Sequence, residues 1–301
     1  MNKKVSIVLI NYNTARDTIE CIESLDKVTY DKFDLIIVDN KSKEDDLKKL
    51  EIYTKNKKNC TLVKAEKNGG FAYGNNIGID IAMKRKSDYI LLLNSDTEVE
   101  EDFLEYLVKT LEEDIERNAI AIGKINYYSN KKKIWYGGGE IDWNKYIGIH
   151  YGENQDDFGQ FDKKKEITFA TGCAMLINAN LPINTKLPEE YFMYFEDVDF
   201  CASILEKGYK IIYEPKAVIY HKVGASGGGE SSPFTLRWSN RGRFIFMNKY
   251  KYKSSKLKFF LTKNYFYATR IIKSICLSIK GDFISAKAII SGTLDGMKSI
   301  R

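Results

Sequence analysis

Three short apolar runs, separated by helix-length segments, constrain most strongly what this chain can fold into. The runs occupy residues 5–10, 35–39 and 89–93, are rich in β-branched residues or leucine, and end in polar residues. Such runs indicate strands that are buried on both faces of a sheet. The segments between them carry apolar residues at helical spacing, as at Ile19, Ile22 and Leu25. Strands that alternate with helices predict parallel βαβ units and therefore an open α/β sheet.

The pattern changes after about residue 125, where aromatic residues and glycines become frequent. Residues 135–146 predict hairpins or a mobile flap, and strand-like segments follow at 171–177 and near Ile211 and Val218. With 301 residues, 44% of them hydrophobic, the chain can bury one substantial core. We expect one main domain with an appendage, built from a Rossmann-like half and a mixed α/β half.

Polar residues follow each apolar run, at the strand ends where ligands bind open α/β sheets. A single such segment is explained by ordinary turn chemistry, but three of them at one sheet edge indicate a ligand site. A strand-end carboxylate there can bind a hard divalent cation together with phosphate oxygens. The three segments are Asn11-Tyr12-Asn13, Asp39-Asn40 and Asn94-Ser95-Asp96.

A glycine-containing loop, residues 68–76 with the sequence NGGFAYGNN, precedes a predicted helix. Its glycines would let the backbone approach a ligand closely, although a glycine-assisted turn with an Asn cap explains it equally well. The loop matches neither the dinucleotide spacing G-x-G-x-x-G nor the phosphate loop G-x-x-x-x-G-K-S/T. This disfavours a dehydrogenase and an ATPase.

Three acids, Glu196, Asp197 and Asp199, follow an aromatic stretch at a predicted helix start. Acids in a first turn stabilise any helix by about 0.3–1 kcal/mol, which is the simpler explanation. Three acids beside five apolar or aromatic residues nevertheless favour a partly desolvated general base, and local chemistry leaves open which of the three it is. His221 lies between a strand-like run and a glycine-rich stretch. A lone histidine is more often structural than a metal ligand.

Scattered cysteines, five in all, suggest neither a zinc knuckle nor a disulfide framework and favour a reducing cytoplasm. No run of about 18 apolar residues predicts a spanning helix. Residues 237–301, however, carry 15 Lys and Arg against two Asp, while the rest of the chain carries 32 basic and 39 acidic residues. A basic tail of this kind suggests an anionic partner.

Within this tail, residues 256–280 predict a basic amphipathic helix. Such a helix would lie on an anionic bilayer, or would pack on the main domain with its lysines in solvent, and the sequence leaves both open. Its apolar residues recur at 3- and 4-residue spacing: Leu261, Tyr265, Ala268, Ile272, Ile275 and Ile279.

Taken together, several segments resemble the family 2 glycosyltransferases with the GT-A fold, particularly their rhamnosyltransferase-like branch. The resemblance covers roughly residues 1–250, and the order of the motifs is more specific than any one of them. The matching segments are VSIVLINYN at 5–13, LIIVDNKS at 35–42, NGGFAYGNNIGI at 68–79, LLLNSDTEV at 91–99, TGCAMLI at 171–177, FEDVDF at 195–200 and GYKIIYEPKAVIYH at 208–221.

The resemblance implies a catalytic domain over residues 1–230 and a basic helical extension over 231–301. The nucleotide-binding half would cover about 1–125 and the acceptor-binding half about 126–230. The family implies inverting transfer of a sugar from a UDP-, dTDP- or GDP-linked donor to a saccharide or polyprenyl-linked saccharide hydroxyl in surface polysaccharide synthesis. The enzyme would be cytoplasmic, with peripheral contact to an anionic membrane through the extension.

Residue roles follow from the same resemblance, position by position. Asp197 matches the base that deprotonates the acceptor, and Asp96 and His221 match ligands of Mg²⁺ or Mn²⁺. The glycine-rich loop 224–232 is a predicted lid. The residues that match nucleotide-sugar contacts are Tyr12, Asn13, Asp39, Asn40, Asn68, Gly70, Asn75 and Asn94.

One departure concerns the D-x-D metal motif, whose first acid is replaced by Asn94. The replacement removes one negative charge, so we expect weaker metal binding or binding that depends on the donor. The rhamnosyltransferase-like branch often has Asn at this place, which points to a subgroup rather than to inactivity.

Two other functions are weighed against this one. A sugar-nucleotide pyrophosphorylase would need a glycine-rich loop with Arg and Lys after the first strand, and residues 11–14 offer none. A non-enzymatic nucleic-acid-binding protein would use the basic tail, but no RNP, KH or zinc-finger pattern occurs and the body is net acidic. We therefore expect no nucleic-acid partner.

Overall fold

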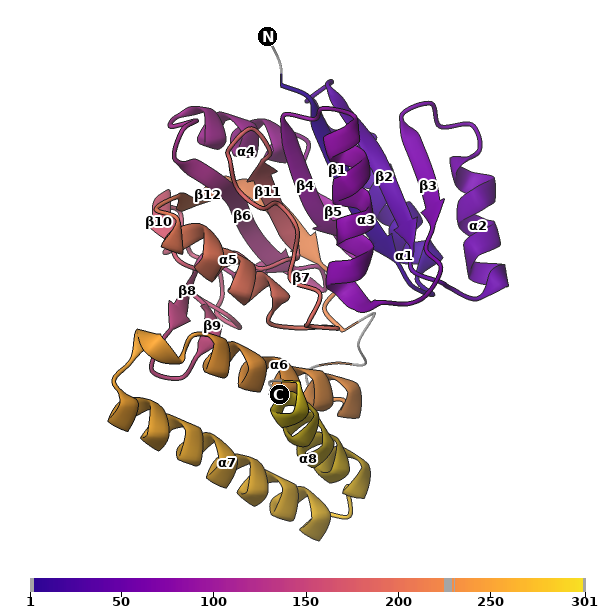
Figure 1. Ribbon diagram of the computed structural model, residues 1–301. Coiled ribbons are helices and arrows are strands. Elements are labelled where there is room, and N and C mark those ends of the chain that lie inside the picture. The colour runs from indigo at the N-terminus through magenta and orange to yellow at the C-terminus, as the bar shows by residue number, and fades with distance from the viewer. Residues whose placement is uncertain (1–2, 225–228, 230, 300–301) are drawn as a thin grey trace.

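A mixed ten-stranded sheet forms the centre of the structure, a computed structural model that describes residues 3–224, 229 and 231–299. The strand order is β10-β12-β6-β11-β4-β1-β2-β3, with β5 paired to β12 and β7 to β6 (Figure 1). The neighbours β4, β1, β2 and β3 are parallel to one another. They span Val5–Asn11 (β1), Phe33–Asp39 (β2), Cys60–Lys64 (β3) and Tyr89–Asn94 (β4).

The three apolar runs are confirmed as strands, and helices connect them as βαβ units require. These helices are Ala15–Leu25 (α1), Glu44–Thr54 (α2) and Gly70–Lys84 (α3). Strand β3 was not predicted, because it lies at the sheet edge and its residues are only half-buried or exposed. Gly78 lets α3 cross β1 closely, since an added Cβ would lie 2.3 Å from Cγ1 of Val8.

The second half completes the sheet with mixed strand directions, because β11 runs antiparallel to β4 and β6 while β12 runs parallel to β6. The predicted Rossmann-like half followed by a mixed half is therefore confirmed. The remaining strands of this sheet are Thr97–Val99 (β5), Asn118–Tyr127 (β6), Asn130–Tyr136 (β7), Lys165–Ile167 (β10), Ala174–Asn178 (β11) and Lys210–His221 (β12). Helices α4 (Phe103–Glu112) and α5 (Glu196–Glu206) connect them.

Strand β12 differs from the expectation of two short strands near Ile211 and Val218, because it is one continuous strand. Its register with β6 shifts between Glu214 and Val218. Pro215 lies inside this shift, and proline lacks the N–H that a regular ladder needs, so an irregularity accommodates it. Beyond the shift the strand carries His221 to the edge where β5 pairs with it.

A hairpin of β8 (Gly139–Asp142) and β9 (Ile147–His150) matches the hairpin predicted for the aromatic and glycine-rich segment. Trp143 at its turn stacks on Phe246 of α6 (Pro233–Lys249), with ring centroids 5.7 Å apart. Phe246 and Tyr250 belong to the main hydrophobic core. The hairpin and α6 thus attach the C-terminal helices to the sheet domain.

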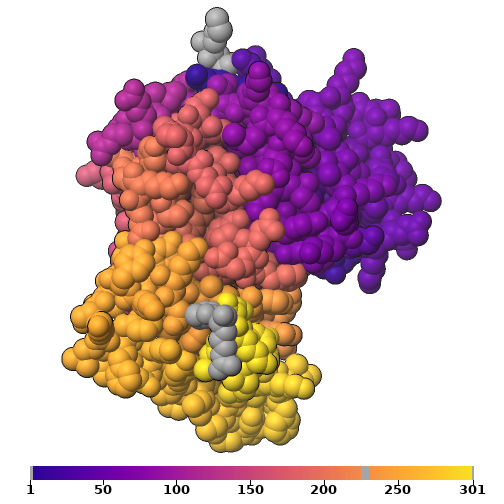
Figure 2. Space-filling view, in the orientation of Figure 1, coloured from indigo at the N-terminus to yellow at the C-terminus, as the bar shows by residue number. Residues whose placement is uncertain are grey.

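The C-terminal helices form a lobe beside the sheet domain (Figures 1 and 2). They comprise α6, the short 3₁₀ helix Lys251–Lys253 (η1), α7 (Lys256–Ile279) and α8 (Phe283–Lys298). Helix α8 packs closely across α6 at Gly292, where an added Cβ would lie 2.1 Å from the carbonyl oxygen of Arg237. Helix α7 packs inward through Phe266, which is completely buried.

The predicted apolar stripe of α7 does not face the protein. All six of its residues, Leu261, Tyr265, Ala268, Ile272, Ile275 and Ile279, are exposed, and we call them the α7 outer stripe. The opposite side of the helix makes the contacts, because Phe266 and Tyr267 lie against Phe244 of α6. Among the described residues, no helix combines the length and the apolar character that crossing a membrane requires.

Candidate active site

Asp39 is buried at the carboxyl end of β2, with its two oxygens bonded to different donors. Asn11, at the end of β1, donates its side-chain amide to Oδ1 at 2.9 Å, and the backbone N–H of Ser42 donates to Oδ2 at 3.0 Å. The same amide of Asn11 lies within bonding distance of Ser42 Oγ and of an oxygen of Asp46. This network fixes the sheet edge at which Asp39 was predicted to bind a nucleoside.

The neighbouring residues Tyr12 and Asn13 differ in what they can offer a ligand. The Tyr12 side chain is 47% exposed, so its ring is accessible. Asn13 has a left-handed backbone, with φ 59°, and its Oδ1 accepts the N–H of Lys43 at 2.8 Å. The Asn13 side chain thus holds a turn, as ordinary turn chemistry predicts, and its nucleotide contact stays a prediction.

The glycine loop is tied both to Asn40 and to the segment that precedes the three acids. Asn40 donates to Oδ1 of Asn68 at 3.1 Å and to the carbonyl of Gly70 at 3.0 Å, while its own Oδ1 is buried without a partner among the described residues. Phe71 donates its N–H to the carbonyl of Phe192 at 2.8 Å. The Asn75 amide bonds back to Phe71 inside α3. One N–H of the Asn75 amide is thereby engaged, and the nucleotide contacts of Asn40 and Asn75 stay predictions.

Asp96 and His221, 125 positions apart, are brought together by the pairing of β5 with β12. Oδ1 of Asp96 lies 3.2 Å from Nε2 of His221, and both side chains are buried. The imidazole packs edge-on against Trp135, with ring centroids 4.5 Å apart. Its Nδ1 has no hydrogen-bond partner among the described residues. Burial alone would lower the pKa of His221, but Cys173 and Asp96 raise it to about 10.

The imidazole of His221 thus lies between the Cys173 thiol and the Asp96 carboxylate, which both favour its protonated form. A bound divalent cation would displace this proton and take Asp96 and His221 as ligands. Within the described residues no group of three His, Cys, Asp or Glu could hold a metal. One carboxylate and one imidazole, whose Nδ1 has no partner among the described residues, fit a cation that receives its remaining ligands from a bound diphosphate.

The three acids at the start of α5 have separate environments. Asp199 is buried and accepts hydrogen bonds from the Tyr250 hydroxyl and the Lys249 ammonium, each at 2.6 Å, which makes it a structural residue. Asp197 accepts the N–H groups of Gly172 at 3.0 Å and Val198 at 2.8 Å. Glu196 is buried, and its Oε2 has no partner among the described residues.

These environments favour different protonation states for the adjacent carboxyl groups of Glu196 and Asp197. Burial and then the charge of Asp197 raise the pKa of Glu196 to about 8, so that Glu196 is protonated at neutral pH. Burial also raises the pKa of Asp197, but the two backbone N–H groups oppose that shift. Asp197 is therefore the group with the stronger tendency to be ionised, as a general base must be.

Gly172 and Cys173 connect Asp197 with Asn94 and His221, a link that the sequence did not predict. Gly172 donates to Asp197, while the carbonyl of Cys173 accepts the N–H of Asn94 at 2.8 Å. The Cys173 thiol lies against His221. The segment TGCAMLI belongs to the resemblance and was the only signal for this link. Nothing in the pattern around Trp135 indicated its contact with His221.

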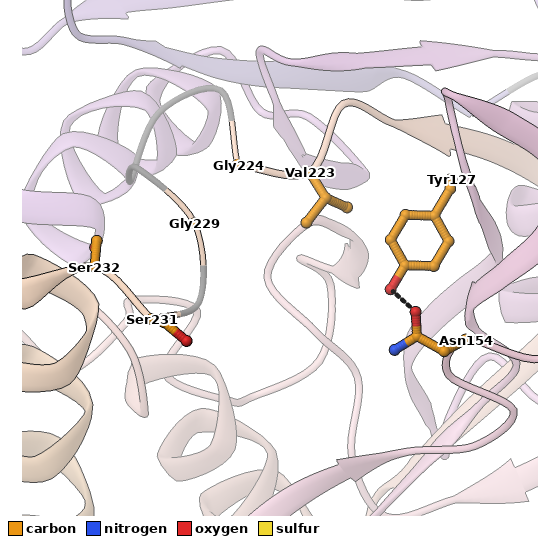
Figure 3. Close-up of a pocket in the computed structure, with 7 residues that line it drawn as sticks. All are labelled: Tyr127, Asn154, Val223, Gly224, Gly229, Ser231 and Ser232. Atoms are coloured by element: carbon orange, nitrogen blue, oxygen red, sulfur yellow. Dashed lines mark hydrogen bonds between the residues drawn. The ribbon is translucent and has the colours of Figure 1, made fainter. Parts of the chain in front are cut away.

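An open cavity of about 590 Å³ is lined in part by residues that follow His221 in the sequence (Figure 3). The hydroxyl of Tyr127 donates to Oδ1 of Asn154 at 3.1 Å on one side of it. The predicted lid, residues 224–232, includes residues 225–228 and 230, which lie outside the described residues. The residues that line the cavity are Tyr127, Asn154, Val223, Gly224, Gly229, Ser231 and Ser232.

The sheet and its edge have the architecture of the GT-A glycosyltransferases, as comparison with solved structures shows. The chain resembles GalNAc-T7 crystallised with UDP, GalNAc and Mn²⁺, with a TM-score of 0.62 and 18% identity over 82% of this chain and 48% of that one. It also resembles mannosyltransferase PcManGT from Pyrobaculum calidifontis in complex with GDP-Man and Mn²⁺, with a TM-score of 0.59 and 12% identity over 99% and 88% of the chains.

The chain belongs to glycosyl transferase family 2, whose family model matches residues 6–181. Glycosyltransferase GlyG of Streptococcus pneumoniae is 31% identical over 43% of this chain, and the match spans 40% of GlyG. Amylovoran biosynthesis glycosyltransferase AmsB of Erwinia amylovora is 28% identical over 84% of this chain and 82% of its own length. Asp197 and His221 lie beyond the part that the family model matches.

Proposed function

We propose that this enzyme transfers a sugar, with inversion, from a nucleoside-diphosphate sugar to a hydroxyl group of a saccharide or lipid-linked saccharide. The observation that carries the proposal is the segment Gly172-Cys173, which contacts Asp197 on one side and both Asn94 and His221 on the other. This contact supports a general base at Asp197 beside a diphosphate-binding site near Asn94 and His221. An inverting transfer needs this combination of groups.

In the proposed reaction Asp197 accepts the proton of the acceptor hydroxyl while that oxygen bonds to the anomeric carbon. The bond between this carbon and the diphosphate oxygen breaks, and the nucleoside diphosphate leaves. Protonated Glu196 adds no second negative charge beside the base. Asp39 and Asn40, with the exposed ring of Tyr12, would hold the nucleoside, and Asn68, Gly70 and Asn94 would lie toward the diphosphate.

A divalent cation, Mg²⁺ or Mn²⁺, is part of the proposal, with Asp96 and His221 as its ligands. It would supply positive charge opposite the diphosphate as that group departs. The structures of GalNAc-T7 and PcManGT contain Mn²⁺, which supports a divalent cation at this fold. Because Asn94 replaces an acid, the chain offers few anionic ligands, and we expect the cation and the donor to bind together.

The structural neighbours, the sequence motifs and one relative support a more specific assignment of the substrates. UDP and GDP-mannose in the structural neighbours support a nucleotide-sugar donor. Asn94 and the motif order support rhamnosyl transfer from a dTDP-linked donor, and AmsB supports a role in surface polysaccharide synthesis. An acceptor on a lipid carrier would place the enzyme at the cytoplasmic face of a membrane, in peripheral contact through its basic C-terminal helices.

The test replaces the proposed base and separates catalysis from binding. Asp197→Asn should reduce release of nucleoside diphosphate from a donor panel with Mn²⁺ by about a hundredfold or more. Donor binding, measured by calorimetry, should change little, because the replacement keeps the shape of the side chain. Asp114→Asn, which removes an exposed carboxylate 3.6 Å from Lys210, serves as the control and should leave turnover unchanged. Near-normal turnover in Asp197→Asn would exclude Asp197 as the base.

A further inference from the structure

The C-terminal hairpin of α7 and α8 exposes more apolar surface than any other described part of the molecule. Beyond the α7 outer stripe, Phe283, Ile284, Leu294 and Met297 of α8 are exposed. Exposure is greatest around the turn, where Ile279 is 80% and Ile284 is 72% exposed. Isolated exposed apolar residues are common in proteins, but a continuous set on adjacent helices marks an interaction surface.

The outward direction of the stripe is fixed by the packing on the other side of α7. Phe266 is completely buried there, and Arg270 donates to Oδ1 of Asn240 in α6 at 2.9 Å. Rotating the helix to bury the stripe would remove these contacts and expose Phe266. The helix is about 36 Å long at 1.5 Å per residue, so the stripe forms an extended band.

Basic residues accompany this apolar surface and have no acidic partners on it. Lys273, Lys280 and Lys287 recur every seven residues, are exposed, and form no ion pair with any described residue. The two acids of residues 237–301 are already engaged. Asp295 pairs with Arg237 at 2.8 Å, and Asp282 caps α8 by accepting the N–H of Ser285 at 3.0 Å. The exposed face is thus both apolar and positively charged.

We propose that the α7 outer stripe, continued by Phe283 and Ile284 of α8, docks on the surface of an anionic lipid bilayer. Apolar side chains would enter the interface between headgroups and acyl chains, while Lys280 and Lys287 reach the lipid phosphates. A second copy of this chain fits the face less well, because it would bring the same lysines together without any acid to oppose them. The docking proposal depends on the proposed function at one point only: a lipid-linked acceptor would lie in the same membrane.

Co-sedimentation of the full chain with lipid vesicles tests the proposal without any catalytic step. Vesicles of phosphatidylcholine are compared with vesicles that also contain phosphatidylglycerol, at low and high salt. We expect binding to the anionic vesicles, weakened by salt, and about tenfold weaker binding for the double variant Ile279→Glu, Ile284→Glu. Lys280→Glu with Lys287→Glu should weaken binding to anionic vesicles and reduce its salt dependence.

The matched control is Ile52→Glu, which changes a 68% exposed isoleucine on α2 in the sheet domain and should leave vesicle binding unchanged. Circular dichroism and donor hydrolysis without vesicles, measured on every variant, report folding and the proposed catalysis separately. The proposal is wrong if the wild-type chain does not bind anionic vesicles. It is also wrong if Ile52→Glu weakens binding as much as the hairpin variant. A vesicle-independent dimer that Ile279→Glu dissociates would assign the face to a second copy instead.

Discussion

At the end of β2 each oxygen of the buried Asp39 carboxylate accepts a hydrogen bond, whereas at the start of α5 the buried Glu196 carboxylate leaves Oε2 without one. The two sides of the candidate site, the end of β2 and the start of α5, therefore differ in how completely they bond a buried carboxyl group. A network that satisfies every oxygen makes a rigid anchor, while an unsatisfied carboxyl group retains its proton. The proposed donor side, around Asp39, is thus held in one shape, whereas the proposed acceptor side, around Glu196 and Asp197, separates the pKa values of two adjacent acids.

A close contact at Gly70 joins these two sides. Gly70, at the start of α3, lies so near the carbonyl of Phe192 that an added Cβ would be 1.9 Å from that oxygen. Phe192 in turn precedes Tyr194 and Phe195, which both have left-handed backbones, with φ of 68° and 77°. The backbone that aims Glu196 and Asp197 thus depends on a glycine of the donor-side loop.

The largest effect should come from breaking this contact with Gly70→Ala. The new Cβ meets a backbone oxygen, and the φ of 88° at this residue disfavours any side chain. We expect the free energy of unfolding to fall by about 3 kcal/mol in urea denaturation. Gly208→Ala is the control, because its φ is 81° but nothing lies within 4 Å of an added Cβ. It should cost about 1 kcal/mol. Equal losses of stability in the two variants would show that the close contact with Phe192 does not add to the cost of the side chain.

A smaller effect, visible in its pH dependence, should distinguish the two acids. Glu196 has a folded pKa of about 8 against an ordinary value of 4.5, so the folded state binds the extra proton between these values. Stability that is complete below pH 4.5 is therefore lost as the pH rises toward 8, by up to about 1.4 kcal/mol per pH unit.

Glu196→Gln should remove this loss, because an amide does not titrate. Urea midpoints of the wild-type chain should fall more steeply between pH 5 and pH 8 than those of Glu196→Gln, which keep the loss above pH 6.5 that the raised pKa of His221 causes. Glu105→Gln, at an exposed site on α4 beside Lys109, should keep the wild-type dependence. Parallel curves for wild type and Glu196→Gln would mean that Asp197, not Glu196, holds the proton.

Local sequence signals predicted the parts of the site that depend on one element. The apolar runs located β1, β2 and β4, and the polar residues after them located Asp39 and Asp96, because strand burial and strand ends leave direct traces in the sequence. The helical spacing of the tail likewise predicted α7. It did not predict which side of α7 faces the protein, because Phe266 and Arg270 make the inward contacts from a side with less regular apolar spacing.

Contacts between distant segments could not be predicted in the same way. The meeting of His221 with Asp96 depends on the register of β12, which changes at the irregularity around Pro215. The contact of Gly70 with Phe192 depends on where α5 and α3 stand relative to the sheet. The amide N–H of Asn75 bonds to the carbonyl of Phe71 one helical turn earlier, a pairing that the four-residue spacing already allowed, and its contact with the diphosphate stays a prediction.

The smallest effect concerns the charge at the proposed metal site, where Asn94 replaces the acid that the D-x-D motif would supply. Asn94→Asp restores this carboxylate two residues from Asp96. Because oxygen ligands with negative charge bind divalent cations more tightly, Mn²⁺ affinity without donor should rise about tenfold, or about 1.4 kcal/mol. Calorimetric titration with Mn²⁺ measures the change. Asn184→Asp, which adds the same charge at an exposed position, should leave the affinity unchanged. An equal rise in both variants would reduce the effect to net charge, whereas a rise only in Asn94→Asp would mean that Asn94 makes cation binding depend on the donor.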